Sequence, residues 1–449
     1  YETPGALTLA EYNANPSAAR PAGGGFPGAV DAKAAIYQKN LLAGLNSVYE
    51  FNNSFRNATT LYGAYSQIKN PAIRNYERRN EPSFGGRTTF TWNNKKEANT
   101  AVQVVGGAEF QEGYFNTLVS KNRNGQPDTM QTNDDIRYSA LSFFAQADLI
   151  ISDKWFIQGG ISLNKTKVEF QRLNRYPVIK QSRTYQNELA PRLSVVRKFG
   201  KYLSLSATIS RGFSPPTVAE LLPSTGVIST DLEAEEGWNY EMSAHYSFFN
   251  KRLNLEATGF YFKLDNALVQ RKDASNADYF VNAGDVQQKG LELHADYNYV
   301  THSSHFINYI TINTDYTYSH FRYGSFVKGS DDFSGKIVPS VPSNVLSVMA
   351  DVQLRNGIYT NITFYSASRI YLNDANTAFA DPYQLMGLRL GWKKSWKQKI
   401  RANFFAGADN LFDERYSLGN DINAAGGRYY NAALPRNYYA GVGFQVIRK

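Results

Sequence analysis

Apolar and polar side chains alternate along most of this 449-residue chain, and this two-residue period constrains the fold more than any other feature. Successive side chains of a β-strand point to opposite faces, so a strand with one apolar face shows this period, whereas a helix shows a period of 3.6. In residues 238–248 the apolar set is Trp238, Tyr240, Met242, Ala244, Tyr246 and Phe248. No stretch has a convincing helical period, and Asp31 to Gln38 comes closest. The pattern predicts an all-β protein.

The alternation predicts 17 extended segments. Their cores lie near residues 33–51, 58–69, 87–91, 99–121, 137–151, 156–170, 189–196, 202–214, 237–248, 253–269, 279–300, 306–324, 339–354, 358–371, 383–390, 401–416 and 436–447. Short connections alternate with long ones, the long ones being 70–86, 122–136, 171–188, 215–236, 270–278, 325–338, 372–382 and 417–435. Every strand of a transmembrane barrel crosses the bilayer, so short periplasmic turns alternate with longer extracellular loops. The connections therefore predict a transmembrane antiparallel β-barrel.

The two strand faces agree with a barrel in a membrane. Aromatic residues make up 14% of the chain, yet no uncharged apolar run is long enough for a spanning helix. The polar face of residues 310–319 is bulky and hydrogen-bonding, as expected of a barrel lumen. Aromatic pairs such as Tyr429-Tyr430 and Tyr438-Tyr439 lie near strand ends, where aromatic girdles are found. The alternative is a soluble protein with stacked rings in a dry core.

The predicted strand number is odd, whereas single-chain bacterial barrels have an even number. Residues 1–32 contain no alternating segment and are predicted to form an extracellular loop. A plugged transporter barrel has about 22 strands. We therefore expect residues 1–449 to be one outer-membrane β-barrel domain that is incomplete at its N-terminus, with about five strands missing.

Five stretches of the chain resemble a known family. They are residues 211–221, 232–241, 282–292, 407–416 and 435–444, among them Arg-Gly-Phe-Ser-Pro-Pro-Thr-Val-Ala-Glu-Leu at 211–221 and Gly-Ala-Asp-Asn-Leu-Phe-Asp-Glu-Arg-Tyr at 407–416. In order and spacing they resemble the C-terminal barrel of TonB-dependent outer-membrane receptors. The opening Tyr1 to Gly5, with Asn15-Pro16 and Ala19-Arg20-Pro21, is similar to the ferric-citrate branch of that family.

The resemblance implies a 22-stranded barrel closed by an N-terminal plug, which imports iron chelates, haem, cobalamin and some sugars or metals. Its energy would come from the TonB complex, through a short box ahead of the plug; neither plug nor box is in this sequence. Two departures from the family pattern are present. Glu233-Ala234-Glu235 replaces the usual Lys-Pro-Glu, and the chain ends Val446-Ile447-Arg448-Lys449 rather than on an aromatic residue.

The net charge of +9 raises the question of an anionic partner. The excess lies in the predicted short turns, at Lys95, Lys96, Arg197, Lys198, Lys251, Arg252, Lys393, Lys394 and Lys397. Cations there are expected to form a solvated rim at the membrane interface, and the predicted loops are net acidic. This distribution does not favour nucleic acid as a partner.

Two basic clusters in the predicted long loops are the candidate ligand-binding residues. Arg74, Arg78 and Arg79 lie beside Tyr76, and Arg175 and Arg183, with Arg172 and Lys180, lie near Tyr176 and Tyr185. Guanidinium groups bind carboxylate or catecholate oxygens bidentately, and neighbouring rings stack on planar ligands. This chemistry suits an anionic ferric chelate. The alternative is contact with lipopolysaccharide phosphate, or solvation. Segment 215–236 is acidic and suits a cation better.

Enzymatic chemistry has little support in the sequence. There is no Cys, no Gly-rich phosphate loop opens a helix, and the five His show no metal-ligand spacing. We therefore expect no catalytic residue, no metal site and no cofactor. An outer-membrane phospholipase or protease barrel is the enzymatic alternative.

The sequence predicts a TonB-dependent receptor that imports a ferric chelate, siderophore or iron-citrate, across the bacterial outer membrane. Expected partners are the TonB complex, outer-membrane lipid and lipopolysaccharide, and the chelate. Two alternatives stay open: a passive diffusion pore, and a barrel that serves as a scaffold with other outer-membrane subunits.

Overall fold

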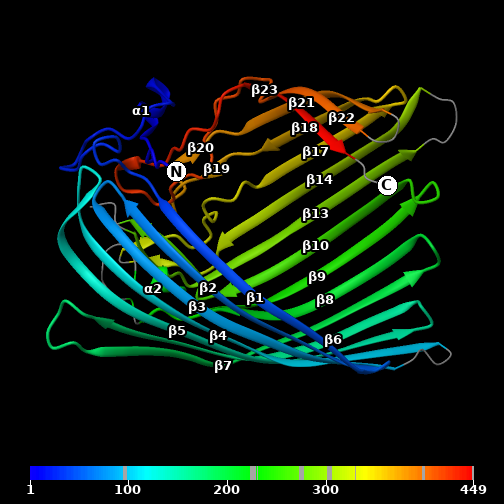
Figure 1. The fold of residues 1–449 in the computed structure, drawn as a ribbon, viewed down its shortest axis with the longest axis horizontal. Helices are drawn as coiled ribbons and strands as arrows, with labels where there is room; N and C mark the ends of the chain where they lie inside the picture. Colours follow the sequence, from blue (N-terminus) through cyan, green and yellow to red (C-terminus); the bar gives the residue numbers. More distant parts are fainter. Residues whose placement is uncertain are drawn as a thin grey trace.

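The computed structural model describes residues 1–94, 99–222, 229, 231–272, 278–300, 306–328, 330–396 and 400–446. Seventeen strands form one antiparallel sheet in chain order (Figure 1). They are β1 (Tyr37–Asn52), β2 (Phe55–Pro71), β3 (Asn75–Asn93), β4 (Thr100–Arg123), β5 (Gln126–Ile151), β6 (Trp155–Arg172), β7 (Lys180–Phe199), β8 (Leu203–Ser214), β9 (Glu235–Phe248), β10 (Leu253–Asp265), β13 (Asp285–Val300), β14 (Ile307–Tyr323), β17 (Asn344–Leu354), β18 (Ile358–Ala367), β21 (Tyr383–Trp396), β22 (Ile400–Asp409) and β23 (Asn437–Val446).

Three small hairpins stand apart from this sheet at one end of it. They are β11 (Leu268–Lys272) with β12 (Asp278–Asn282), β15 (Val327–Lys328) with β16 (Asp331–Asp332), and β19 (Ile370–Tyr371) with β20 (Phe379–Ala380). The helices are α1 (Leu9–Ala14), α2 (Val218–Leu221) and the 3-10 turn η1 (Ala425–Gly427). In the described part of the chain, no helix is long and apolar enough to cross a membrane.

The predicted all-β class and the predicted number of strands are confirmed, but three predicted long loops are wrong. Segments 70–86 and 122–136 are mostly strand, and only residues 72–74 and 124–125 connect the strands there. In segment 171–188 the connection is shorter than predicted and consists of residues 173–179. Strict alternation of short and long connections therefore fails at β2 to β5. The backbone ladder continues where the side chains turn polar, because strand hydrogen bonds do not depend on side-chain polarity.

Two short helices were not predicted from the sequence. Residues 31–33 form a turn and β1 begins at Tyr37, so Asp31 to Gln38 is not helical, and α1 and α2 lie elsewhere. Each has a capping box: Thr8 with Glu11, and Thr217 with Glu220. This Thr-x-x-Glu pattern was visible in the sequence, and it predicts a helix start even where the helix is too short to show a period.

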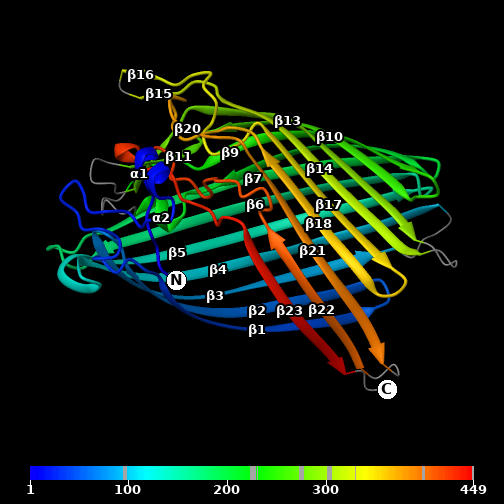
Figure 2. The same cartoon turned by 90° about the horizontal axis from the view of Figure 1, so that it is seen from above.

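The two faces of the curved sheet can be assigned from what packs on them. Helix α2 lies on the concave side, between the walls of the sheet (Figure 2), where Leu221 packs with Ile136 of β5 and Val168 of β6. Leu141 lies five residues along β5 from Ile136, so it points to the convex face together with its cross-strand partner Phe110. Strand register extends this assignment around the sheet.

The convex face is apolar. Its exposed side chains include Leu61, Phe90, Trp92, Phe110, Leu141, Phe143, Ile161, Leu163, Leu193, Leu205, Trp238, Tyr240 and Met242. Toward the end that carries the small hairpins the same face becomes polar: on β6, Ile161 and Leu163 are followed by Lys165, Lys167 and Glu169. At the opposite end of the sheet, several cations of the predicted rim lie over aromatic rings.

Arg197 lies 4.5 Å from the ring centroid of Trp155, Lys198 4.2 Å from that of Phe156, and Lys393 4.6 Å from that of Tyr359. Lys95, Lys96 and Lys397 lie outside the described residues. The rim cations therefore have ring contacts in addition to the predicted solvation.

The sheet has two edges, β1 and β23. Each pairs with one neighbour, β2 and β22 respectively, and the two edge strands run in the same direction. Residues 1–36 precede the sheet and lie at the hairpin end, while β23 ends at the opposite end (Figure 1).

Candidate functional site

The connections at the hairpin end pack together into what we call the loop layer. It consists of residues 1–36, 215–234, 266–284, 324–343, 368–382 and 410–436, as far as these are described. Most of the buried side chains of the protein lie in this layer or directly beneath it.

Asp374 is the central charge of the loop layer. Its side chain is 2% exposed, and its Oδ2 lies 2.6 Å from Nη2 of Arg271. The Tyr323 hydroxyl donates to Asp374 Oδ1 at 2.7 Å, and Asn423 Nδ2 donates to the same oxygen at 3.1 Å. Burial, with the adjacent Asp374 charge, raises the pKa of the Tyr323 phenol, so it stays a hydrogen-bond donor. Three connections of the sheet and the end of β14 thus meet at one carboxylate.

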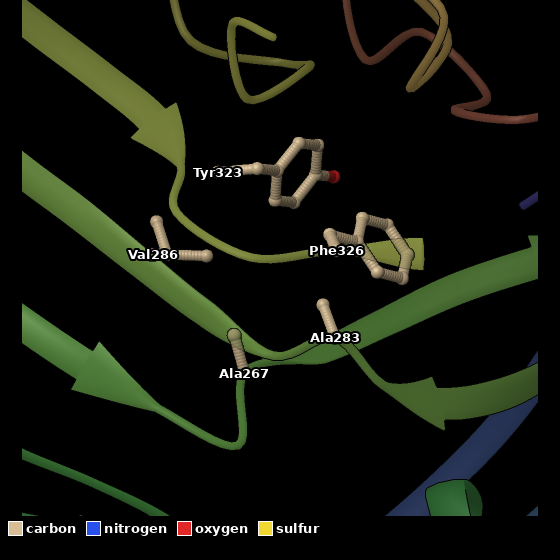
Figure 3. Close-up of a cluster of buried hydrophobic side chains, with 5 residues drawn as sticks. All are labelled: Ala267, Ala283, Val286, Tyr323 and Phe326. Atoms are coloured by element: carbon tan, nitrogen blue, oxygen red, sulfur yellow. The ribbon is translucent and has the colours of Figure 1, made fainter. Parts of the chain in front are cut away.

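An apolar cluster supports this charge. Ala267, Ala283, Val286, Tyr323 and Phe326 are buried together (Figure 3). The Arg271 guanidinium lies 5.3 Å from the centroid of the Phe326 ring and 5.5 Å from that of Phe333. Rings over the guanidinium face exclude water from the ion pair.

Segment 215–234 is held against the inner wall by β7. The Tyr185 hydroxyl donates to the carbonyl oxygen of Leu232 at 2.8 Å, and Arg183 Nη2 donates to Glu233 Oε1 at 2.7 Å. Next to it, Glu235 accepts from the backbone N–H of Leu268 at 2.6 Å. Burial raises the pKa of Glu235, and the hydrogen bond from Leu268 only partly offsets this.

The N-terminal segment, residues 1–36, is bound to the connection between β22 and β23. Leu7 and Tyr430 exchange backbone hydrogen bonds of 2.8 and 3.1 Å, and Tyr12 stacks on Tyr430 at 5.4 Å between ring centroids. Arg428 donates to both carboxylate oxygens of Glu11, at 2.6 and 2.9 Å. Burial alone would raise the pKa of Glu11, but its hydrogen bonds with Arg428 and Thr8 and the Arg428 charge hold it below the usual value.

The first predicted cluster is divided between the two faces of β3. Arg74 lies in the turn before this strand, 5.7 Å from the centroid of the Phe26 ring. Arg79 points to the concave face, 3.7 Å from Glu77 and 3.5 Å from Glu81. Tyr76 and Arg78 point to the convex face, with the guanidinium 5.5 Å from the ring centroid.

The second predicted cluster is divided as well. Arg175 is exposed in the connection between β6 and β7, whereas Arg183 and Tyr185 point inward and hold segment 215–234. Arg172 pairs bidentately with Asp134, at 2.7 and 3.1 Å, and Lys180 lies 2.9 Å from Glu169. Strands β4, β5 and β6 separate β3 from β7, so the two clusters do not form a single site.

Sequence reasoning missed the residues that organise the loop layer, above all Arg271, Tyr323, Asp374 and Asn423. Three of them lie in different connections and Tyr323 ends β14, so no short-range spacing links them. Their meeting depends on the order of strands around the sheet. Among the described residues, no group of three or more His, Asp or Glu is placed to hold a metal ion.

The chain has recognisable relatives. Residues 3–411 match the family described as TonB dependent receptor-like, beta-barrel. The chain is 24% identical over 289 residues to the ferrioxamine receptor of Yersinia enterocolitica, covering 62% of this chain and 36% of the receptor. It is 23% identical over 300 residues to the pesticin receptor of Yersinia pestis, covering 64% and 41%. The chain thus spans about two fifths of the length of these curated relatives.

Solved structures share the fold. The ferric citrate transporter FecA in its unliganded form superposes with a TM-score of 0.77 at 17% identity, covering 99% of this chain and 65% of that one. The ferric yersiniabactin uptake receptor FyuA from Yersinia pestis gives 0.69 at 15% identity, covering 94% and 62%. Together with the family match across most of the sequence, these likenesses agree with the antiparallel sheet and its apolar convex face: the chain belongs to the TonB-dependent receptor β-barrel family.

Proposed function

We propose that this protein is part of an outer-membrane receptor that imports a ferric chelate by energised transport. The observation that carries the proposal is the family match over residues 3–411, together with relatives named as receptors or transporters of ferrioxamine, ferric citrate and ferric yersiniabactin. A siderophore or iron-citrate is the expected cargo. TonB would supply the energy.

The convex face supports a location in the outer membrane. It exposes Leu, Phe, Trp and Tyr side chains strand after strand, whereas soluble monomers rarely expose continuous apolar patches larger than a few hundred Å². The hairpin end would then face the outside, because it carries the longer connections.

The ligand-contact assignment stays a proposal for five of the seven predicted residues. Arg74 and Arg175 lie in turns at the hairpin end, and Arg79, Arg183 and Tyr185 point to the concave side. Of these, Arg183 and Tyr185 would bind a chelate only if segment 215–234 moved, because they now bind that segment. Tyr76 and Arg78 point to the convex face instead.

Transport can be tested with the full-length gene in a strain that lacks it. We expect uptake of a radiolabelled ferric siderophore or ferric citrate that requires both this protein and TonB. Exchanging Arg74, Arg79 and Arg175 together for Gln should reduce chelate binding, while Lys201→Gln with Lys251→Gln, at the opposite end, should not. Uptake that persists without TonB would favour a passive pore, and no uptake of any ferric chelate would contradict the proposal.

A further inference from the structure

Three cations lie side by side on the convex face at the hairpin end of β1, β2 and β3. Lys69 of β2 is directly opposite Arg78 of β3 in the strand register, and Lys39 of β1 is opposite Gln67, two residues before Lys69. All three belong to the face that carries Leu61 further along β2. Like charges directly opposite each other on a sheet are destabilising unless something compensates them.

No carboxylate compensates these cations. Among the described residues none of Lys39, Lys69 and Arg78 forms an ion pair. The cations of the same face further around the sheet are different: Arg137 lies 3.0 Å from Glu112, and Lys167 lies 2.8 Å from Glu169. Within β1 to β3, Lys39, Lys69 and Arg78 therefore form a group of positive charge with no carboxylate partner, which suits an anionic ligand.

The aromatic ring of Tyr76 packs against this group of cations. Its side chain is only 7% exposed, and its ring carries the Arg78 guanidinium at 5.5 Å. Tyr76 also lines an open cavity between the N-terminal segment and the ends of β1 and β2, with Tyr37, Lys33, Lys39 and Lys69. No Asp or Glu contributes to that lining.

The position of Lys39, Lys69 and Arg78 along their strands indicates which anion they bind. On the convex face of β2 the exposed apolar residues end with Leu61 and Tyr65, and Gln67 and Lys69 follow. At about 3.3 Å per residue, Lys69 lies roughly 13 Å beyond Tyr65 along the strand. If the apolar face lies in hydrocarbon, the cations lie at the level of the headgroups.

We propose that Lys39, Lys69 and Arg78, backed by Tyr76, bind the phosphate of an outer-leaflet lipid headgroup. Lys and Arg are the residues that hold phosphate oxygens, Arg as a bidentate fork. A chelate bound for the lumen would not reach this site, because the site faces away from the concave side. The inference rests on the proposed outer-membrane location, but it does not depend on which chelate is imported.

The test compares lipid binding by the full-length protein in detergent with that of matched variants. The probes are lipid A with both phosphates, the same lipid without phosphates, and inorganic phosphate, titrated by native mass spectrometry. Lys69→Gln with Arg78→Gln should weaken binding of phosphorylated lipid A roughly thirtyfold. The control, Lys201→Gln with Lys251→Gln, removes the same charge at the other end and should bind like the unchanged protein.

The outcomes separate the inference from the function on which it rests. Equal affinity of the double variant and the unchanged protein for phosphorylated lipid A would overturn the site, as would equal affinity for the lipid without phosphates. Tight binding of inorganic phosphate alone would overturn the assignment to a lipid. If the double variant lost chelate binding but kept lipid binding, Arg78 would be assigned to the chelate site and not to a lipid site. A failure of chelate import in the unchanged protein would contradict the proposed function while leaving the lipid result intact.

Tyr76→Phe should keep lipid binding, which checks that the ring and not its hydroxyl supports Arg78.

Discussion

Asp374 carries a charge in a position that is 2% exposed, where an unpaired carboxylate would be strongly disfavoured. Arg271 and Asn423, from two other connections, and Tyr323, at the end of β14, offset that cost. Removing one partner of a buried pair costs more than the pair contributes, because the other charge stays buried.

Asp374→Asn should therefore destabilise the loop layer by about 3 to 5 kcal/mol. The amide can keep a hydrogen bond with Tyr323 but leaves Arg271 without a counter-charge. Amide hydrogen exchange of residues 266–272 and 368–382 should become faster while exchange in β17 and β18 stays slow. Asp381→Asn removes an exposed carboxylate in the same connection and is the control. Unchanged exchange in Asp374→Asn would show that this pair does not hold the layer together.

At the scale of elements, the alternating pattern was enough to predict the seventeen strands of the sheet. It did not predict how far β2 to β5 extend, because Arg78 and Asp135 on the convex face read as loop residues once the apolar pattern stops. It also could not predict the meeting of Arg271 with Asp374, which depends on the positions of distant connections. If residues 75–82 had been recognised as strand, counting residues from Leu61 through the β2–β3 pairing would have placed Tyr76 and Arg78 on the convex face.

The extension of β3 and β5 beyond the apolar face makes a prediction of its own. Amides of residues 75–82 and 132–135 should exchange slowly, because they are paired in register with β2, β4 or β6. Residues 173–179, in a true connection, should exchange quickly. Fast exchange throughout 75–82 would mean that the original assignment of a long loop was right.

Attachment of the N-terminal segment should depend on pH. The pKa of Glu11 is lower when the segment is bound than its ordinary value of 4.5. A carboxylate of this kind contributes its stability above the ordinary pKa and loses it as the pH falls through the lowered one. The segment should therefore be bound at neutral pH and should loosen as the pH falls below 4.5.

The chain contains no Cys, so Ser17→Cys with Leu418→Cys introduces a unique pair of labelling sites. Spin-label distances between them should broaden on acidification, and Glu11→Gln should give a distribution that does not change over the same pH range. An acid response that is equally large in Glu11→Gln would assign the pH dependence to another group.

For the whole molecule, the apolar convex face predicts that the purified protein needs detergent or lipid. Burying that face in an apolar phase is favourable by about 25 cal/mol per Å², which is a large total over a surface of this kind. Size-exclusion chromatography in detergent should give a defined species, and dilution into plain buffer should give aggregation. A stable, folded monomer in buffer without detergent would contradict the membrane location.

The N-terminal segment contacts the connection that leads into β23, and it continues directly into β1. It therefore joins the two edge strands of the sheet at one end, through the Glu11–Arg428 pair and the backbone bonds between Leu7 and Tyr430. A force that pulls on the N-terminal segment would act on these few contacts first, and they can break with every strand ladder intact. Release of the segment would consequently uncover Arg428 and Tyr430 at the hairpin end without unfolding any strand.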